Sequence, residues 1–111
     1  MKISRSDKSG VVVLSLSGKL MGGTDADKFH DQIKSILDEG ARHVLVDLAN
    51  VSWVNSTGLG ILISAHATVS NAEGQMKLCH VSKRVDSILM VTRLNMIFES
   101  YDDEAQALAS F

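Results

Sequence analysis

The residues of this 111-residue chain that could do chemistry gather in one short stretch, Asn55-Ser56-Thr57-Gly58-Leu59-Gly60, called the junction below. Apolar runs lie on both sides of it, so a strand is expected to pass into a helix here. Asn, Ser and Thr side chains accept hydrogen bonds from the unpaired amides of a starting helix. The same amides and the helix dipole also favour an anion, such as a phosphate on a hydroxyl. The junction is therefore interpreted either as a helix cap or as a switch that carries an anion.

Asp47, Cys79 and His80 are further candidates for chemistry. Asp47 ends an apolar run and could bind a metal, but no second carboxylate or histidine lies close to it in the sequence, so a capping or loop hydrogen bond is expected. Cys79 beside His80 suggests a thiol nucleophile. Because neighbouring residues in a strand point to opposite faces, adjacency alone cannot bring the thiol and the imidazole together. A packed thiol is therefore expected, and neither a metal site nor a cofactor is predicted.

An enzymatic alternative is a small hydrolase with a Ser or Thr nucleophile. Such a nucleophile needs a base within hydrogen-bonding reach, and the histidines are the only candidates: His30, His43, His66 and His80. None of them has a motif context, so no enzymatic activity is expected. The glycines of the junction also lack the lysine and the longer glycine pattern of a nucleotide-binding phosphate loop.

The composition limits the remaining classes of function. Hydrophobic residues make up 45% of the chain and charged residues 22%, as in a folded globular protein. The net charge is -2 and the longest basic feature is Lys83-Arg84, so neither nucleic acid nor an anionic membrane is an expected partner. The single cysteine excludes an intramolecular disulfide, and no apolar run approaches the roughly 18 residues of a membrane span. One cytoplasmic domain over residues 1–111 is predicted.

The elements that position the junction begin with two strands and a helix. The strands are predicted around Ile3 and over Val11–Ser17, joined by a turn at Asp7–Gly10. Glycines at 18, 22 and 23 break the pattern and leave residues 20 and 21 in a loop. A helix is then expected from Thr24, as its N-cap, to a stop at residue 40.

The rest of the chain alternates strands and helices. Residues 44–48 form an apolar run typical of a central strand, and the helix after the junction ends near residues 71–74. A strand at 76–80, a helix capped by Ser82 with Asn95 as its left-handed terminator, a strand at 96–98 and a final helix from Asp102 follow. This order predicts an α/β fold: a mixed, mostly parallel five-stranded sheet, antiparallel at its first hairpin, with about four helices packed against it.

Several of these stretches resemble the STAS domain family, and within it the small bacterial anti-sigma factor antagonists. Trp53 to Gly60 is similar to the family's aromatic-apolar-Asp-Ser-Ser/Thr-Gly-Leu-Gly signature, and Val44 to Leu48, with its Asp, is similar to the strand before it. Gly18-Lys19-Leu20 matches the Gly-x-Leu after the second strand. Asn95 to Phe98 precedes a last helix rich in Ala and Leu, as in family members. The resemblance covers essentially the whole chain and implies the STAS fold.

The resemblance also implies a function, that of a protein-binding module switched by phosphorylation. The hydroxyl directly before Gly-Leu-Gly is Thr57, with Ser56 as the second candidate. In the family, an anti-sigma factor that is also a Ser/Thr kinase phosphorylates this residue, the unphosphorylated antagonist binds the anti-sigma factor so that sigma is released, and a PP2C-type phosphatase resets the switch. The expected partner-binding surface gathers around the junction: Met21, Gly22, Gly23, Asn55, Ser56, Thr57, Gly58 and Leu59.

One position departs from the family pattern. Asn55 stands where the family usually has Asp, which removes a like charge beside a future phosphate but also removes a group that could position the hydroxyl for the kinase. A second binding function keeps the fold without the switch: a STAS subunit or scaffold that binds a transport ATPase or a signalling complex.

Overall fold

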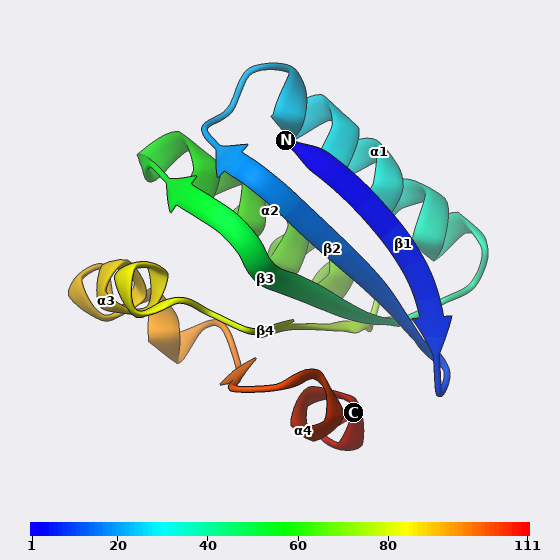
Figure 1. Ribbon diagram of the computed structural model, residues 1–111. Helices are drawn as coiled ribbons and strands as arrows, with labels where there is room; N and C mark the ends of the chain where they lie inside the picture. The colour runs from blue at the N-terminus through cyan, green and yellow to red at the C-terminus, as the bar shows by residue number, and fades with distance from the viewer.

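The computed structural model describes all 111 residues and places five strands in one sheet, in the order β1-β2-β3-β4-β5 (Figure 1). Their bounds are β1 Lys2–Lys8, β2 Val11–Leu20, β3 His43–Val54, β4 Gln75–Cys79 and β5 Ser100–Tyr101. The first two strands pair antiparallel and the other pairs are parallel. The mixed, mostly parallel sheet predicted from the alternating pattern is confirmed, with β3 at its centre.

Both faces of the sheet carry apolar side chains and are covered by helices. Side chains in β2 point alternately to opposite faces, so successive apolar residues enter two different clusters. Val12, Leu14 and Leu16 belong to the main core, whereas Val11 and Val13 belong to a smaller cluster on the other face. The helices divide in the same way. Residues of α1 (Thr24–Asp38), α2 (Ser56–Asn71) and α3 (Lys83–Val91) contribute to the main core, and α4 (Glu104–Ala109) covers the smaller cluster.

Figure 1 shows this arrangement, with α1 and α2 behind the strands and α4 in red near the C-terminus.

Two helices begin at a residue whose side chain caps the first turn. The Ser82 hydroxyl accepts a hydrogen bond from the Val85 amide at 3.2 Å, as predicted, and Asp103 caps α4 by accepting one from the Gln106 amide at 2.7 Å. Each cap satisfies an amide that has no partner within its own helix.

The segment between β2 and α1 differs from the prediction. Leu20, expected in a loop, is the last residue of β2 and is fully buried. Thr24 was expected to cap α1, but Gly23 occupies the N-cap with φ 68° and no side chain caps the helix. Glycine adopts such a positive φ without steric cost, so the turn after β2 can be tight enough to begin α1 one residue earlier.

The end of the chain also contains corrections. Arg93, rather than Asn95, has the left-handed conformation after α3, with φ 60°. A 3-10 turn, η1 (Leu94–Met96), follows, and the predicted strand at 96–98 is absent. The amides of Ile97 and Phe98 bond back to the Leu94 carbonyl, so they are not available to β4. The two residues of β5 pair with β4 instead.

Candidate functional site

The junction lies where the central strand β3 passes directly into α2. Asn55 is the N-cap of α2, and its Oδ1 accepts a hydrogen bond from the Gly58 amide at 2.8 Å. Its Nδ2 donates to the Met21 carbonyl at 3.3 Å. The predicted capping role of the junction is therefore confirmed. The same side chain also ties the loop before α1 to the start of α2.

Ser56 and Thr57, the two candidate hydroxyl residues, are exposed in the first turn of α2. The first turn of a helix presents amides without intrahelical partners and the positive end of the dipole. No acidic residue lies in this turn. An anion attached at either position would thus meet a favourable helix end without a carboxylate in the same turn.

Two glycines set the backbone around Thr57. A Cβ built on Gly58 would lie 1.9 Å from the Leu20 carbonyl oxygen, so α2 can touch the end of β2 only because this side chain is missing. A Cβ built on Gly22, where φ is 102°, would lie 2.5 Å from Cγ2 of Thr57. The loop before α1 therefore packs directly against the residue that carries the candidate hydroxyl.

The structure separates the predicted partner-binding residues into exposed and buried groups. Met21 is 46% exposed, and Gly23, Ser56 and Thr57 are also exposed, while Gly22 and Asn55 are partly exposed. Gly58 and Leu59 are buried, and Leu59 is only 6% exposed. Their contribution is to hold the shape of the junction, since little of either is accessible to a partner.

The sequence reasoning missed a basic and aromatic surface beside the junction. Trp53 is 39% exposed, and the Arg84 guanidinium carbon lies 5.3 Å from the centroid of its indole ring. A hollow of about 370 Å³ lies here, lined by Lys19, Met21, Ser52, Trp53 and Arg84. A tryptophan two residues before the junction was the available signal, because tryptophan and arginine are enriched among residues that dominate binding energy.

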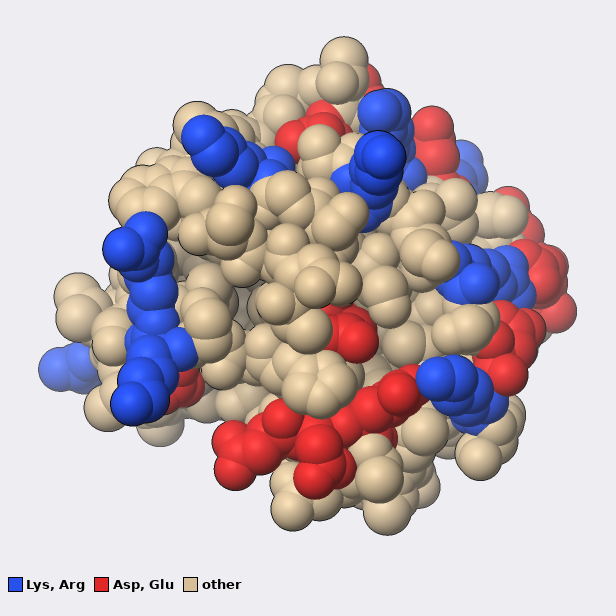
Figure 2. All heavy atoms as spheres, viewed as in Figure 1, with Lys and Arg blue, Asp and Glu red and all other residues tan.

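Charge is unevenly distributed over the face that Figure 2 shows. Lys and Arg side chains lie on the left of this view, on the side of α3, and also along its top and right, while acidic side chains form a band lower down, toward the segment that leads into α4. That segment carries Asp102, Asp103 and Glu104. Two cations border the hollow beside the junction: Lys19 from β2 and Arg84 from α3.

A second cluster joins Asp47, Cys79 and His80. Nδ1 of His80 lies 3.0 Å from Oδ1 of Asp47 and 3.8 Å from Sγ of Cys79. The expectation that the thiol and the imidazole point apart is wrong, because His80 lies beyond the end of β4 and has a φ of 54°. The expectation that Asp47 makes a capping or loop hydrogen bond is wrong in its location: Oδ1 accepts from the Ala49 amide at 2.9 Å, but both residues lie within β3.

Cys79 is nevertheless a packed thiol, as expected. It is fully buried, and burial, with a smaller contribution from the Asp47 charge, raises the pKa of the thiol to about 12. The thiol therefore stays protonated near neutral pH, and only a thiolate is an effective nucleophile. This pair does not have the character of a catalytic cysteine and its base.

Three of the four histidines are engaged away from the junction hydroxyls. The rings of His66 and Phe98 pack edge to face with centroids 5.3 Å apart, His43 lies 5.2 Å from the ring of Phe111, and His80 faces Asp47. His30 lines a small hollow between α1 and α2. None of these contacts supplies a base to Ser56 or Thr57.

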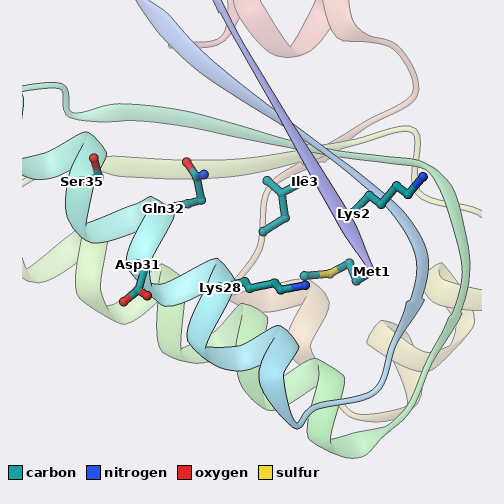
Figure 3. Close-up of a pocket in the computed structure, with 7 residues that line it drawn as sticks. All are labelled: Met1, Lys2, Ile3, Lys28, Asp31, Gln32 and Ser35. Atoms are coloured by element: carbon teal, nitrogen blue, oxygen red, sulfur yellow. The ribbon is translucent and has the colours of Figure 1, made fainter.

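A larger hollow, of about 600 Å³, lies between β1 and α1 and is shown in Figure 3. Lys28 extends from α1 toward Met1, whereas Asp31 points away from it. The polar groups of this hollow do not converge on one point, so it is a weak candidate for a binding site.

None of the helices combines the length and the apolar character needed to cross a membrane.

Comparisons with known proteins agree with this geometry. The family model for the STAS domain matches residues 2–107. The anti-sigma F factor antagonist of Paenibacillus polymyxa is 27% identical over 113 aligned positions, which cover 97% of this chain and 92% of that relative.

Solved structures share the fold. An anti-sigma factor antagonist from Mycobacterium paratuberculosis superposes with a TM-score of 0.83 at 22% identity, over 98% of this chain and 92% of that chain. The anti-sigma factor antagonist SpoIIAA gives a TM-score of 0.74 in its unphosphorylated form, at 15% identity over 98% of this chain and 96% of that one. Its phosphorylated Bacillus form gives the same TM-score at 16% identity, over 98% of both chains.

Proposed function

This chain belongs to the STAS domain family, and on that premise we propose that it is an anti-sigma factor antagonist, a protein-binding module switched by phosphorylation of Thr57. The observation that carries the proposal is the exposed residue Thr57, which carries a hydroxyl, at the positive end of α2, in a first turn without carboxylates. Relatives with the same fold bear the antagonist name, and SpoIIAA has been solved in both phosphorylated and unphosphorylated forms.

In the proposed unphosphorylated state, the surface around the junction binds an anti-sigma factor that has Ser/Thr kinase activity, and sigma is released. Met21 and Trp53 supply exposed apolar contact area, and Arg84 adds a cation fixed over the indole ring. Residues of these types commonly anchor protein interfaces. The binding takes place in the cytoplasm, and a PP2C-type phosphatase restores the unphosphorylated state.

Phosphorylation would switch binding through local charge rather than by refolding. A phosphate adds roughly −1.5 to −2 charges and three strong acceptors, which the start of α2 tolerates. The partner surface, which accommodated a neutral hydroxyl, would have to desolvate or repel this dianion. A loss of about 4 kcal/mol in binding free energy corresponds to roughly 1000-fold weaker binding, which is enough for a switch.

The amide at position 55 is compatible with this proposal. Asn55 retains the cap to Gly58 that an aspartate could make and adds a donor to the Met21 carbonyl. A carboxylate has no such donor and would add a negative charge beside the phosphate. In this chain the cap is therefore neutral, and the phosphorylated state avoids repulsion from it.

The test uses an anti-sigma factor kinase from the same genome, sought first among the neighbouring genes, with ATP and the purified chain. Mass spectrometry should find one phosphate in the wild type and in Ser56→Ala, and none in Thr57→Ala. Ser56→Ala is the matched control because both hydroxyl residues are exposed in the same turn. Calorimetry should then show that the phosphorylated protein binds the kinase about 1000-fold more weakly and that PP2C treatment restores binding.

Two results would contradict this function. If phosphate persists in Thr57→Ala, the assignment to Thr57 is wrong. If the kinase neither binds nor modifies the chain, the alternative of a STAS subunit without a switch, bound to a transport ATPase or a signalling complex, gains support, and co-purification from native cells would identify that complex.

A further inference from the structure

We propose that Asp47, Cys79 and His80 form a Zn²⁺-binding site, separate from the junction and independent of the proposed switch. Each residue offers one ligand atom, and the carboxylate oxygen, the sulfur and the imidazole nitrogen all lie within 4.8 Å of one another. Zinc in proteins is bound by this set of donor types, usually with tetrahedral geometry, and the cysteine binds as a thiolate, so the Cys79 thiol would release its proton to solvent when the ion binds.

The spacing of the ligand atoms suits a single ion. Zinc bonds of about 2.0–2.3 Å in a tetrahedron place neighbouring ligand atoms about 3.3–3.6 Å apart. The distances from His80 Nδ1 are 3.0 Å to Asp47 Oδ1 and 3.8 Å to Cys79 Sγ. Side-chain adjustments of a few tenths of an ångström would bring these two distances into that range. The Asp47 carboxylate oxygen and Cys79 Sγ lie within 4.8 Å of each other, so rotation of the Asp47 side chain would have to shorten this third distance by up to about 1.2 Å. A water molecule would complete the coordination.

The sheet brings these residues together although they are far apart in the sequence. Asp47 of β3 is the register partner of Cys79 in β4, and His80 follows at the end of β4. The His80 amide donates to the Tyr101 carbonyl at 3.1 Å, which holds the left-handed backbone that turns the imidazole toward Asp47. The Ala49 amide donates to Oδ1 of Asp47 at 2.9 Å and orients the carboxylate, as outer partners do in zinc sites.

An ion can reach the cluster from one side. The side chains of His80 and Asp47 are 34% and 18% exposed, whereas Cys79 is buried beneath them. A mixed sulfur, nitrogen and oxygen set favours Zn²⁺ over Mg²⁺ and Ca²⁺, which prefer oxygen ligands alone. The bound ion would link β3 to the end of β4 on the face that α4 covers.

The experiment uses tag-free protein stripped of metal with a chelator. Calorimetry should show one Zn²⁺ bound per chain and no comparable binding of Mg²⁺. Substitution with Co²⁺ should give the intense visible bands of tetrahedral coordination and the near-ultraviolet charge-transfer band of a cobalt–thiolate bond. The wild type should also melt at a higher temperature with Zn²⁺ than without it, since ligands that bind only the folded state stabilise it.

Variants assign the ligands. His80→Asn keeps a residue that tolerates the left-handed conformation, and Asp47→Asn keeps the shape of the side chain. Both should weaken Zn²⁺ binding at least tenfold. Cys79→Ser should abolish the cobalt–thiolate band; if this buried substitution prevents folding, His80→Asn decides the question alone. His30→Ala, on the exposed surface of α1, is the control and should bind Zn²⁺ like the wild type.

Three results would overturn the proposal: no binding at micromolar Zn²⁺, unchanged affinity in both His80→Asn and Asp47→Asn, or an octahedral Co²⁺ spectrum without a thiolate band. The three residues would then be an ordinary hydrogen-bonded group. Phosphorylation of Thr57 is measured separately, so failure of the metal site does not affect the proposed function.

Discussion

Because Gly58 has no side chain, α2 can approach the end of β2 closely. The Leu20 carbonyl oxygen accepts a hydrogen bond from the Asn55 amide at 3.4 Å and lies only 1.9 Å from the position that a Cβ on Gly58 would take. Gly60, two residues later, has no atom within 4 Å of the corresponding position. Two glycines of one motif thus have different physical roles.

Alanine substitutions at these two glycines should have opposite effects. Gly58→Ala should lower the free energy of unfolding by about 3 kcal/mol, because backbone atoms of β2 would have to move. Gly60→Ala should raise it by about 0.5–1 kcal/mol, since alanine is the better helix former and meets no neighbour. Urea denaturation of both variants measures the difference. Equal effects at the two positions would contradict the close approach of α2 to Leu20.

At Asn55, aspartate and alanine should behave differently. Asn55→Ala loses the cap to Gly58 and the bond to Met21 and should cost about 1–2 kcal/mol of folding free energy. Asn55→Asp keeps the cap and gains a favourable interaction with the helix dipole, so it should cost less than about 0.5 kcal/mol. Thermal denaturation at neutral pH compares the two, and an aspartate as damaging as alanine would show that the bond to Met21 dominates.

Among the elements, β1 is joined to the end of α1 by an ion pair on the surface. The Arg5 guanidinium donates to both carboxylate oxygens of Glu39, at 2.6 and 2.9 Å, and also to Asp7. Hydrogen bonds from Arg5 lower the pKa of Glu39, while the nearby charge of Asp7 acts in the opposite direction. The pair therefore links the edge strand to the helix that packs behind it.

This pair predicts a pH dependence of defined sign. Because the pKa of Glu39 is lower in the folded state than in the unfolded state, its contribution to stability is present above the ordinary carboxyl pKa and is lost as the pH falls through the lowered value. NMR titration of the Glu39 carboxyl carbon should show this low midpoint. Arg5→Gln should return it to the ordinary range, whereas Asp7→Asn should leave it low. An unchanged midpoint in Arg5→Gln would exclude the pair as the cause.

For the molecule as a whole, the second face of the sheet depends on one buried lysine. Lys77 Nζ donates to the carbonyl and hydroxyl oxygens of Ser110, at 2.8 and 3.1 Å, and lies 2.9 Å from Glu99. It also lies 4.8 Å from the ring centroid of Phe111. These contacts hold the C-terminal end of α4 over the small cluster that contains Cys79.

Removing this lysine should expose the thiol of Cys79. Lys77→Ala leaves the oxygens of Ser110 without their donor, at a cost of about 1–3 kcal/mol, so α4 should open more often. The reaction of Cys79 with a disulfide reagent should become on the order of tenfold faster or more. Lys8→Ala is the control, because its pair with Glu104 at the other end of α4 is exposed and should change the rate less than about threefold. Equal rates in the two variants would show that Lys77 does not hold α4.

The sequence by itself determined the features that depend on near neighbours. Alternation of apolar residues predicted the order of strands and helices and the mixed sheet. The caps at Asn55 and Ser82 could be predicted because each bonds to an amide three residues later. The exposure of Thr57 follows from its place in the first turn of α2.

Only the tertiary structure decided the contacts that cross the sheet. The register of β3 and β4 places Asp47 beside Cys79. The backbone leaves the strand at His80, so the side chains of Cys79 and His80 meet. The sequence pattern assumed that the strand continues through residue 80 and therefore predicted that these two side chains point to opposite faces. The contact between Trp53 and Arg84 likewise joins β3 to α3. Such distances depend on strand pairing and helix packing, which are set by the burial of the whole core and not by residues adjacent in the chain.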